Sequence, residues 1–90
     1  MEKVAGRPSD SKPIILPKNS REELRLSLAE FNGHPYVDLR VYYRDDESGE
    51  MRPSRSGITV SPTRWPAFMA GLQQLDEALE QCGLLPLEVR

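Results

Sequence analysis

This sequence of 90 residues is poor in three residue types, with one cysteine, one histidine and three lysines. A single cysteine, Cys82, cannot form an internal disulfide, so we expect a reducing, intracellular compartment. No run approaches the about 18 apolar residues that a membrane-spanning helix needs. The N-terminus also lacks the apolar core of a secretory signal. We therefore expect the chain in the cytoplasm or nucleoid of a bacterium, or in the nucleus of a eukaryote.

Groups that could support catalysis are equally sparse. The one histidine, His34, lies beside a turn signal, and no nucleophile stands near it in the sequence. The sequence has no phosphate-binding glycine loop and no Cys/His set with metal-ligand spacing. The acidic run at residues 45–50 lacks the spacing and the closing glutamate of a calcium loop. We expect a protein that is not an enzyme and that needs no metal and no cofactor.

The balance of charge limits the kind of nucleic-acid contact that the chain can make. With 12 basic and 14 acidic residues, the net charge is −2, which argues against a uniformly basic surface. The lysines all lie in the N-terminal segment, whereas the strand-forming part carries arginines at five positions: Arg25, Arg40, Arg44, Arg52 and Arg55. Arginine suits planar contacts, and lysine on a flexible segment suits diffuse attraction to phosphate.

Proline and a lack of aliphatic residues set the N-terminal segment apart. Residues 1–23 carry three of the eight prolines and few aliphatic side chains. Burial of so little apolar surface cannot offset the entropy lost on ordering, so residues 1–20 are predicted to be a flexible arm. We expect one folded domain over residues 21–85, followed by a short tail at 86–90. A domain this small favours association with a partner chain.

Two strands are predicted from the alternation of apolar and polar side chains. In residues 24–31 the leucines point to one face, while Phe31 falls on the opposite, polar face. Asn32-Gly33 is a strong hairpin signal because both positions tolerate positive φ. Residues 36–44 alternate as well, with the apolar set Val37, Leu39, Val41 and Tyr43 and the exposed set Tyr36, Asp38, Arg40, Tyr42 and Arg44.

Shorter signals complete the predicted architecture. Residues 50–53 and 58–60 are typical of a third and a fourth strand, joined by a turn. A helix follows, with Ser61 or Thr63 as its N-cap, and one such helix could cover one face of the sheet. The predicted fold is α+β, with four antiparallel strands followed by one long C-terminal helix (ββββα).

The predicted helix carries an apolar stripe at steps of three and four residues, formed by Trp65, Phe68, Met69, Leu72, Leu75 and Leu79. Gly83 suits the position after the helix C-terminus. The stripe is long for so small a sheet. We therefore predict that the chain forms a homodimer and that these six residues lie at its interface.

The combination of these motifs resembles the C-terminal domain of the positive cofactor four (p15) family of transcriptional coactivators. The matching stretches lie at 31–33, 37–43, 49–55 and 57–65. A Gly-Glu-Met-basic-Pro segment followed by Gly-Ile and a Ser-Pro-x-x-Trp helix start makes the combination specific. The resemblance implies a homodimer in which each subunit has a curved four-stranded antiparallel sheet. It also implies that single-stranded DNA is held by aromatic stacking and basic groups.

The resemblance further implies roles for individual residues. Phe31 matches the family's stacking phenylalanine, and Tyr43 stands where the family has a stacking tryptophan. The basic groups of the binding channel are matched by Arg40, Arg52 and Arg55. The predicted nucleic-acid site also includes three residues that belong to the same strands, Arg25, His34 and Tyr36.

Two questions stay open at the level of sequence. Alternation places Arg40 and Tyr43 on opposite faces, so in a regular strand Tyr42 or Tyr36 is the better stacking residue. We predict binding of single-stranded DNA in transcription regulation or genome maintenance. The acidic isoelectric point of about 5.4 favours an alternative, a protein-interaction module of the transcription machinery. Single-stranded RNA is an alternative ligand.

Overall fold

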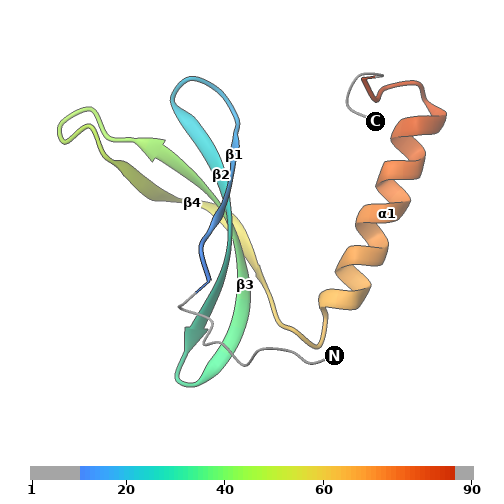
Figure 1. Cartoon of the computed structure of the whole chain (residues 1–90), viewed down its shortest axis with the longest axis horizontal. Helices are drawn as coiled ribbons and strands as arrows, with labels where there is room; N and C mark the ends of the chain where they lie inside the picture. Colours follow the sequence, from blue (N-terminus) through green and yellow to red (C-terminus); the bar gives the residue numbers. More distant parts are fainter. Residues whose placement is uncertain (1–10, 87–90) are drawn as a thin grey trace.

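Four β-strands precede one helix in the computed structural model, which describes residues 11–86 (Figure 1). The elements are β1 (Ile14–Pro17), β2 (Glu22–Phe31), β3 (His34–Arg44), β4 (Met51–Val60) and α1 (Trp65–Gln81). Each strand pairs antiparallel with its neighbour in the chain, so the sheet has the order β1-β2-β3-β4. The predicted class, an antiparallel four-stranded sheet followed by one C-terminal helix, is confirmed.

The first strand lies in the segment that the sequence analysis assigned to a flexible arm. Ile14 pairs with Leu26 and Leu16 pairs with Leu24, so β1 extends the sheet beyond β2. The pairing gives these aliphatic side chains apolar neighbours on the same face, which the composition of the segment alone did not reveal. For Ile14–Pro17 the expectation of a flexible arm is therefore wrong. Residues 1–10 and 87–90 lie outside the described residues, and the domain boundaries stay predictions.

The C-terminal half of the sheet also differs from expectation. The prediction of separate strands at 50–53 and 58–60 is wrong, because the chain remains extended through both as β4. The pairing of β3 with β4 shifts between Arg40 and Tyr42, an irregularity of the β-bulge kind. There the Ser54 hydroxyl donates to a backbone carbonyl of β3 at 2.7 Å. A segment with turn-like composition thus forms a bulge within one strand.

The register of the sheet separates an apolar face from a polar face. The pairing of β2 with β3 runs without a break from Glu22–Tyr43 to Phe31–His34, as the alternation predicts. The apolar face carries leucine, isoleucine and valine side chains, namely Ile14, Leu16, Leu24, Leu26, Leu28, Val37, Leu39, Val41, Ile58 and Val60. Across residues 11–86, Val60 is the only hydrophobic residue that is buried, at 8% exposure. Within residues 11–86, the other side chains of this face are half-buried or exposed.

Helix α1 begins later than either predicted cap. Its N-cap is Arg64, which makes no side-chain capping hydrogen bond, and Pro66 lies in the first turn. The hydroxyls of Ser61 and Thr63 lie 3.1 Å apart and hydrogen-bond to each other. The prediction that one of them caps the helix is therefore wrong. Proline lacks an N–H and is tolerated in a first turn, where that group has no helical partner.

The C-terminal end of α1 follows the predicted pattern. Gly83 adopts φ +69°, the left-handed conformation that glycine allows without a steric penalty. The Leu84 N–H donates to the Leu79 carbonyl at 2.9 Å, and the Gly83 N–H donates to the Glu80 carbonyl at 3.0 Å. This pair of bonds is a Schellman motif, which satisfies two carbonyls at the helix end. The predicted position of Gly83 after the helix is confirmed.

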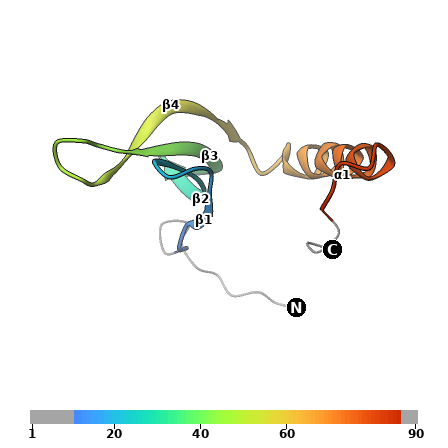
Figure 2. The ribbon, with the colours of Figure 1, turned by 90° about the horizontal axis from the view of Figure 1, so that it is seen from above.

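The helix lies beside the sheet and covers neither of its faces (Figures 1 and 2). Trp65 and Phe68 of its apolar stripe are half-buried, whereas Met69, Leu72, Leu75 and Leu79 are exposed, with Leu75 at 61%. At the start of the stripe, the rings of Trp65 and Phe68 stack with centroids 5.4 Å apart. The expectation that the helix covers its own sheet is therefore wrong for the single chain. Within the part of the chain that the structure describes, no helix has the length and apolarity to cross a membrane.

The loop between β3 and β4 is held by the side chain of Asp45. One carboxylate oxygen accepts bonds from the Ser48 hydroxyl at 2.9 Å, the Ser48 N–H at 3.3 Å and Arg52 Nε at 3.2 Å. The Ser48 hydroxyl contributes most to lowering the pKa of Asp45 below its ordinary value, and Arg52 adds to the effect. Because the pKa is lower in the folded chain, the ionised carboxylate stabilises the fold at neutral pH.

We expect Asp45→Asn to lower the melting temperature at about pH 7, because the amide cannot replace the ionised acceptor. The parent loses this advantage as the pH falls through the folded pKa of Asp45, so the difference between the two proteins should shrink as the solution is made more acidic. Thermal unfolding followed by circular dichroism measures both. Glu47→Gln removes a charge from the same loop and serves as the control. A deficit that persists unchanged in acid would contradict the assignment.

Candidate nucleic-acid interface

The polar face of β2 and β3 brings together most of the predicted site. Cross-strand pairs on this face join Glu23 to Tyr42, Arg25 to Arg40, Ser27 to Asp38, Ala29 to Tyr36 and Phe31 to His34. Five of the eight predicted residues, Phe31, Arg25, Arg40, His34 and Tyr36, therefore share one surface. Thr59 of β4 joins them opposite Asp38. Two strands are enough to hold aromatic and guanidinium groups side by side.

The hairpin end of this face holds an exposed aromatic side chain. Phe31 is 69% exposed, a high value for a phenylalanine, and lies opposite His34 across the turn. The two residues, with Pro35, Tyr36, Thr59 and Ser61, line an open cavity of about 420 Å³. Asn32 at φ 52° and Gly33 at φ 77° make the tight turn that places the ring there. The flat ring can stack on a base, and the neighbouring hydroxyl groups can hydrogen-bond to the edge of that base.

Arg40 is held at the centre of the face by hydrogen bonds from its guanidinium. Its guanidinium donates to Asp38 at 2.9 and 3.2 Å and to the Ser54 carbonyl at 3.2 Å. The bond to Asp38 raises the pKa of Arg40 above its usual range. Gly57 pairs with Arg40 and leaves room for it, since a Cβ at position 57 would lie 2.9 Å from Arg40 Cζ. The guanidinium plane is therefore preorganised by its surroundings.

Arg25 is held in a similar way on the neighbouring strand. Its Nε lies 2.6 Å from a carboxylate oxygen of Glu23, two residues earlier on β2. Its Cζ also lies 4.2 Å from the centre of the Tyr42 ring, a cation–π contact. The sequence analysis did not include Glu23 and Asp38 in the site. An acid two residues before an arginine on one strand was the available signal, because residues at that spacing share a face.

The remaining predicted residues lie elsewhere. Tyr43 pairs with Glu22 and Arg52, on the face opposite Arg40. The irregularity next to Arg40 lies in the pairing with β4, while β3 stays in unbroken register with β2, so it does not move Tyr43 to the polar face. Arg55 is exposed in the irregular part of β4, and among residues 11–86 its side chain makes no hydrogen bond or ion pair. Tyr43 and Arg52 thus lie on the face opposite Phe31, while Arg55 lies in the stretch of β4 that is out of register with β3.

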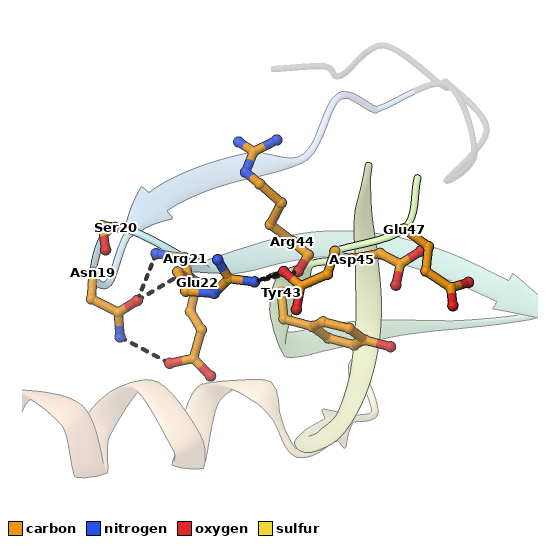
Figure 3. A pocket seen from close by; sticks show the side chains of 9 residues that line it. Asn19, Ser20, Arg21, Glu22, Tyr43, Arg44, Asp45 and Glu47 are labelled. Carbon is orange, nitrogen blue, oxygen red and sulfur yellow. Dashed lines mark hydrogen bonds and ion pairs between the residues drawn. The ribbon is translucent and has the colours of Figure 1, made fainter. Parts of the chain in front are cut away.

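Tyr43 lines a second open cavity, of about 670 Å³, at the other end of β3 (Figure 3). The cavity lies between residues 19–22 and 43–47. Arg21 crosses it, donating to the Arg44 carbonyl at 3.3 Å and pairing with Asp46. Arg52 is likewise paired, with Asp45 at 3.2 Å. Sequence reasoning missed Arg21, because the cavity forms only when the start of β2 meets the end of β3.

Comparisons of the sequence and of the structure with known proteins point to the same family. The profile of the family described as Transcriptional Coactivator p15 (PC4) matches residues 18–71. A Caenorhabditis elegans protein, named as a candidate RNA polymerase II transcriptional coactivator, is 33% identical over 78 residues. The alignment covers 84% of this chain and 60% of that protein, so the chain spans less than two thirds of the relative's length.

Two solved structures share the fold. A PC4 homolog from Burkholderia pseudomallei K96243 superposes with a TM-score of 0.64 at 29% identity, over 72% of this chain and 96% of that one. A bacteriophage T5 homolog of the eukaryotic coactivator PC4 gives a TM-score of 0.62 at 26% identity, over 84% of each chain. The T5 protein is described as implicated in recombination-dependent DNA replication.

We expect Gly57→Ala to destabilise the sheet by about 1–3 kcal/mol, as overpacking does in other proteins. The new Cβ would lie 2.6 Å from the Leu39 carbonyl oxygen, so backbone must move, and the Arg40 guanidinium must leave its place. Urea unfolding measures the effect. Gly71→Ala is the matched control, because nothing lies within 4 Å of a Cβ there and alanine favours the helix by about 1 kcal/mol. Equal effects of the two substitutions would contradict the steric argument.

Proposed function

Because this chain belongs to the transcriptional coactivator p15 (PC4) family, we propose that it binds single-stranded DNA on the polar face of its sheet, as a homodimer. The observation that carries the proposal is the exposed ring of Phe31 on an otherwise polar face. Stacking on aromatic rings is the main sequence-tolerant contact to unpaired bases. Double-stranded DNA offers no free base plane to such a ring.

The names of the relatives support DNA as the ligand and transcription or genome maintenance as the process. One relative is named for RNA polymerase II coactivation and another for a role in DNA replication. We propose a DNA-associated location, the nucleus in a eukaryote or the nucleoid in a bacterium. We also propose that the chain has no catalytic activity, because within residues 11–86 no hydroxyl is hydrogen-bonded to His34, so the polar face presents no activated nucleophile.

The homodimer is proposed from the apolar surface that the single chain leaves uncovered. The apolar face of the sheet and the stripe on α1 both remain accessible. Trp65 lines an apolar groove of about 380 Å³ with Leu26, Leu28, Val37 and Leu39. A monomeric soluble protein seldom exposes apolar surface on this scale. A second copy offers matching apolar surface, since each chain brings both an open sheet face and an open helix stripe.

We expect Phe31→Ala to weaken binding to labelled oligo-dT by about 1–3 kcal/mol, or about 5- to 150-fold, because one stacked base is lost. Fluorescence anisotropy at about 50 mM salt measures the affinity. The same titration of Tyr36→Ala and Tyr43→Ala decides between the register, which favours Tyr36, and the family position, which favours Tyr43. Competition by a matched RNA oligomer tests the ligand class. A parent protein that binds no single strand would contradict the proposal.

We expect light scattering at micromolar concentration to give a mass of twice 10.2 kDa. Leu72→Glu places a charge in the apolar stripe and should shift the mass toward that of one chain, because an unpaired charge is costly to bury. Gln74→Glu adds the same charge on the opposite side of the helix and should leave the mass unchanged. A monomeric parent, or equal dissociation of both variants, would contradict the proposed interface.

A further inference from the structure

We propose that Glu23 and Asp38 determine ligand specificity, because their ion pairs with Arg25 and Arg40 make the centre of the polar face select base planes over phosphate charge. The inference rests on the proposed function and adds a role for two acidic residues of the same surface. The ligand class that it favours is an unpaired strand whose bases are free to stack. The class that it disfavours is duplex DNA, which presents mainly phosphates to a sheet.

The geometry repeats on the two central strands. In each, a carboxylate lies two residues before an arginine on the same face, and the two arginines face each other across the strand pair. The distances are 2.6 Å for Arg25–Glu23 and 2.9 Å for Arg40–Asp38. Two unpaired guanidinium groups directly opposite each other would repel. The acids therefore allow two arginines to lie together at the centre of the sheet.

These ion pairs are more protected from solvent than the pairs that Lys18, Arg21 and Arg52 form. Exposure of the four side chains is 20% and 25% for Glu23 and Arg25, and 19% and 23% for Asp38 and Arg40. Arg52, by contrast, keeps 51% of its side chain exposed in its pair with Asp45. Partly buried pairs are screened less by salt than exposed ones. They should therefore persist while a nucleic acid approaches.

A paired guanidinium offers its plane to a ligand but little net charge. Each phosphate of a single strand that a free basic group neutralises contributes about 0.7 to the slope of log affinity against log salt concentration. Arg25 and Arg40 each already hold a carboxylate, so binding releases few counter-ions at these positions. Arg40 and Tyr42, whose ring carries Arg25, each keep part of their surface accessible, and there a base could stack. At the centre of the face, base stacking then stabilises the complex, whereas contact with phosphate adds little.

The test uses the full chain with Glu23→Gln and Asp38→Asn, separately and together. Anisotropy titrations with a labelled oligo-dT and with a duplex of equal length are run over a salt series. We expect each substitution to steepen the salt slope by about 0.7 and to raise duplex affinity more than single-strand affinity. Glu77→Gln, on the helix, makes the same change in net charge away from the sheet and should leave both values at those of the parent.

A reversal separates the electrostatic role from a structural one. Removing the freed arginine as well, in Glu23→Gln with Arg25→Gln, should return the salt slope to the parent value, which a loss of packing would not do. A parent that binds the oligomer, with both acid variants keeping its slope and its preference for single strands, would overturn this inference and leave the proposed function standing. A parent that does not bind would overturn both.

Discussion

The unbroken antiparallel register between β2 and β3 is the constraint on which the rest of the molecule depends. A turn with positive φ at Asn32 and Gly33 sets that register. Because side chains alternate with a period of two, a slip by one residue would exchange the faces of one strand relative to the other. It would place Phe31 and the Arg25–Glu23 pair of β2 on the same side as the apolar side chains of β3. The site and the surface available for association are therefore two results of one pairing.

The two faces of the sheet differ in how far the single chain completes them. The polar face is nearly complete by itself, since its central charges are paired and its arginines are oriented. The apolar face is incomplete, because α1 lies away from it (Figure 2). A ligand can therefore meet a surface that is already formed on one side, while burial of the other side would supply the driving force for the proposed homodimer.

Local patterns in the sequence predicted what is local in the structure. Alternation placed Phe31 on the polar side, and Gly83 ended the helix, because both effects depend on a few neighbouring residues. The strand at Ile14–Pro17 and the continuous β4 depend on partners that the sequence does not indicate. Ser54 resembles a turn residue until its hydroxyl finds a carbonyl of β3. The arginines were predicted from their residue type. Their pairing with Glu23 and Asp38 depends in addition on the spacing of two residues along each strand.

The simple order of the strands has a consequence for how the chain folds. Each strand pairs only with its neighbours in the chain, so every loop that must close is short. The entropy of closing such loops is small, and contacts of low sequence separation form quickly. Assembly of the sheet is thus a sequence of hairpins and needs no long search. In the proposed homodimer, the slow and concentration-dependent step is then the meeting of two chains.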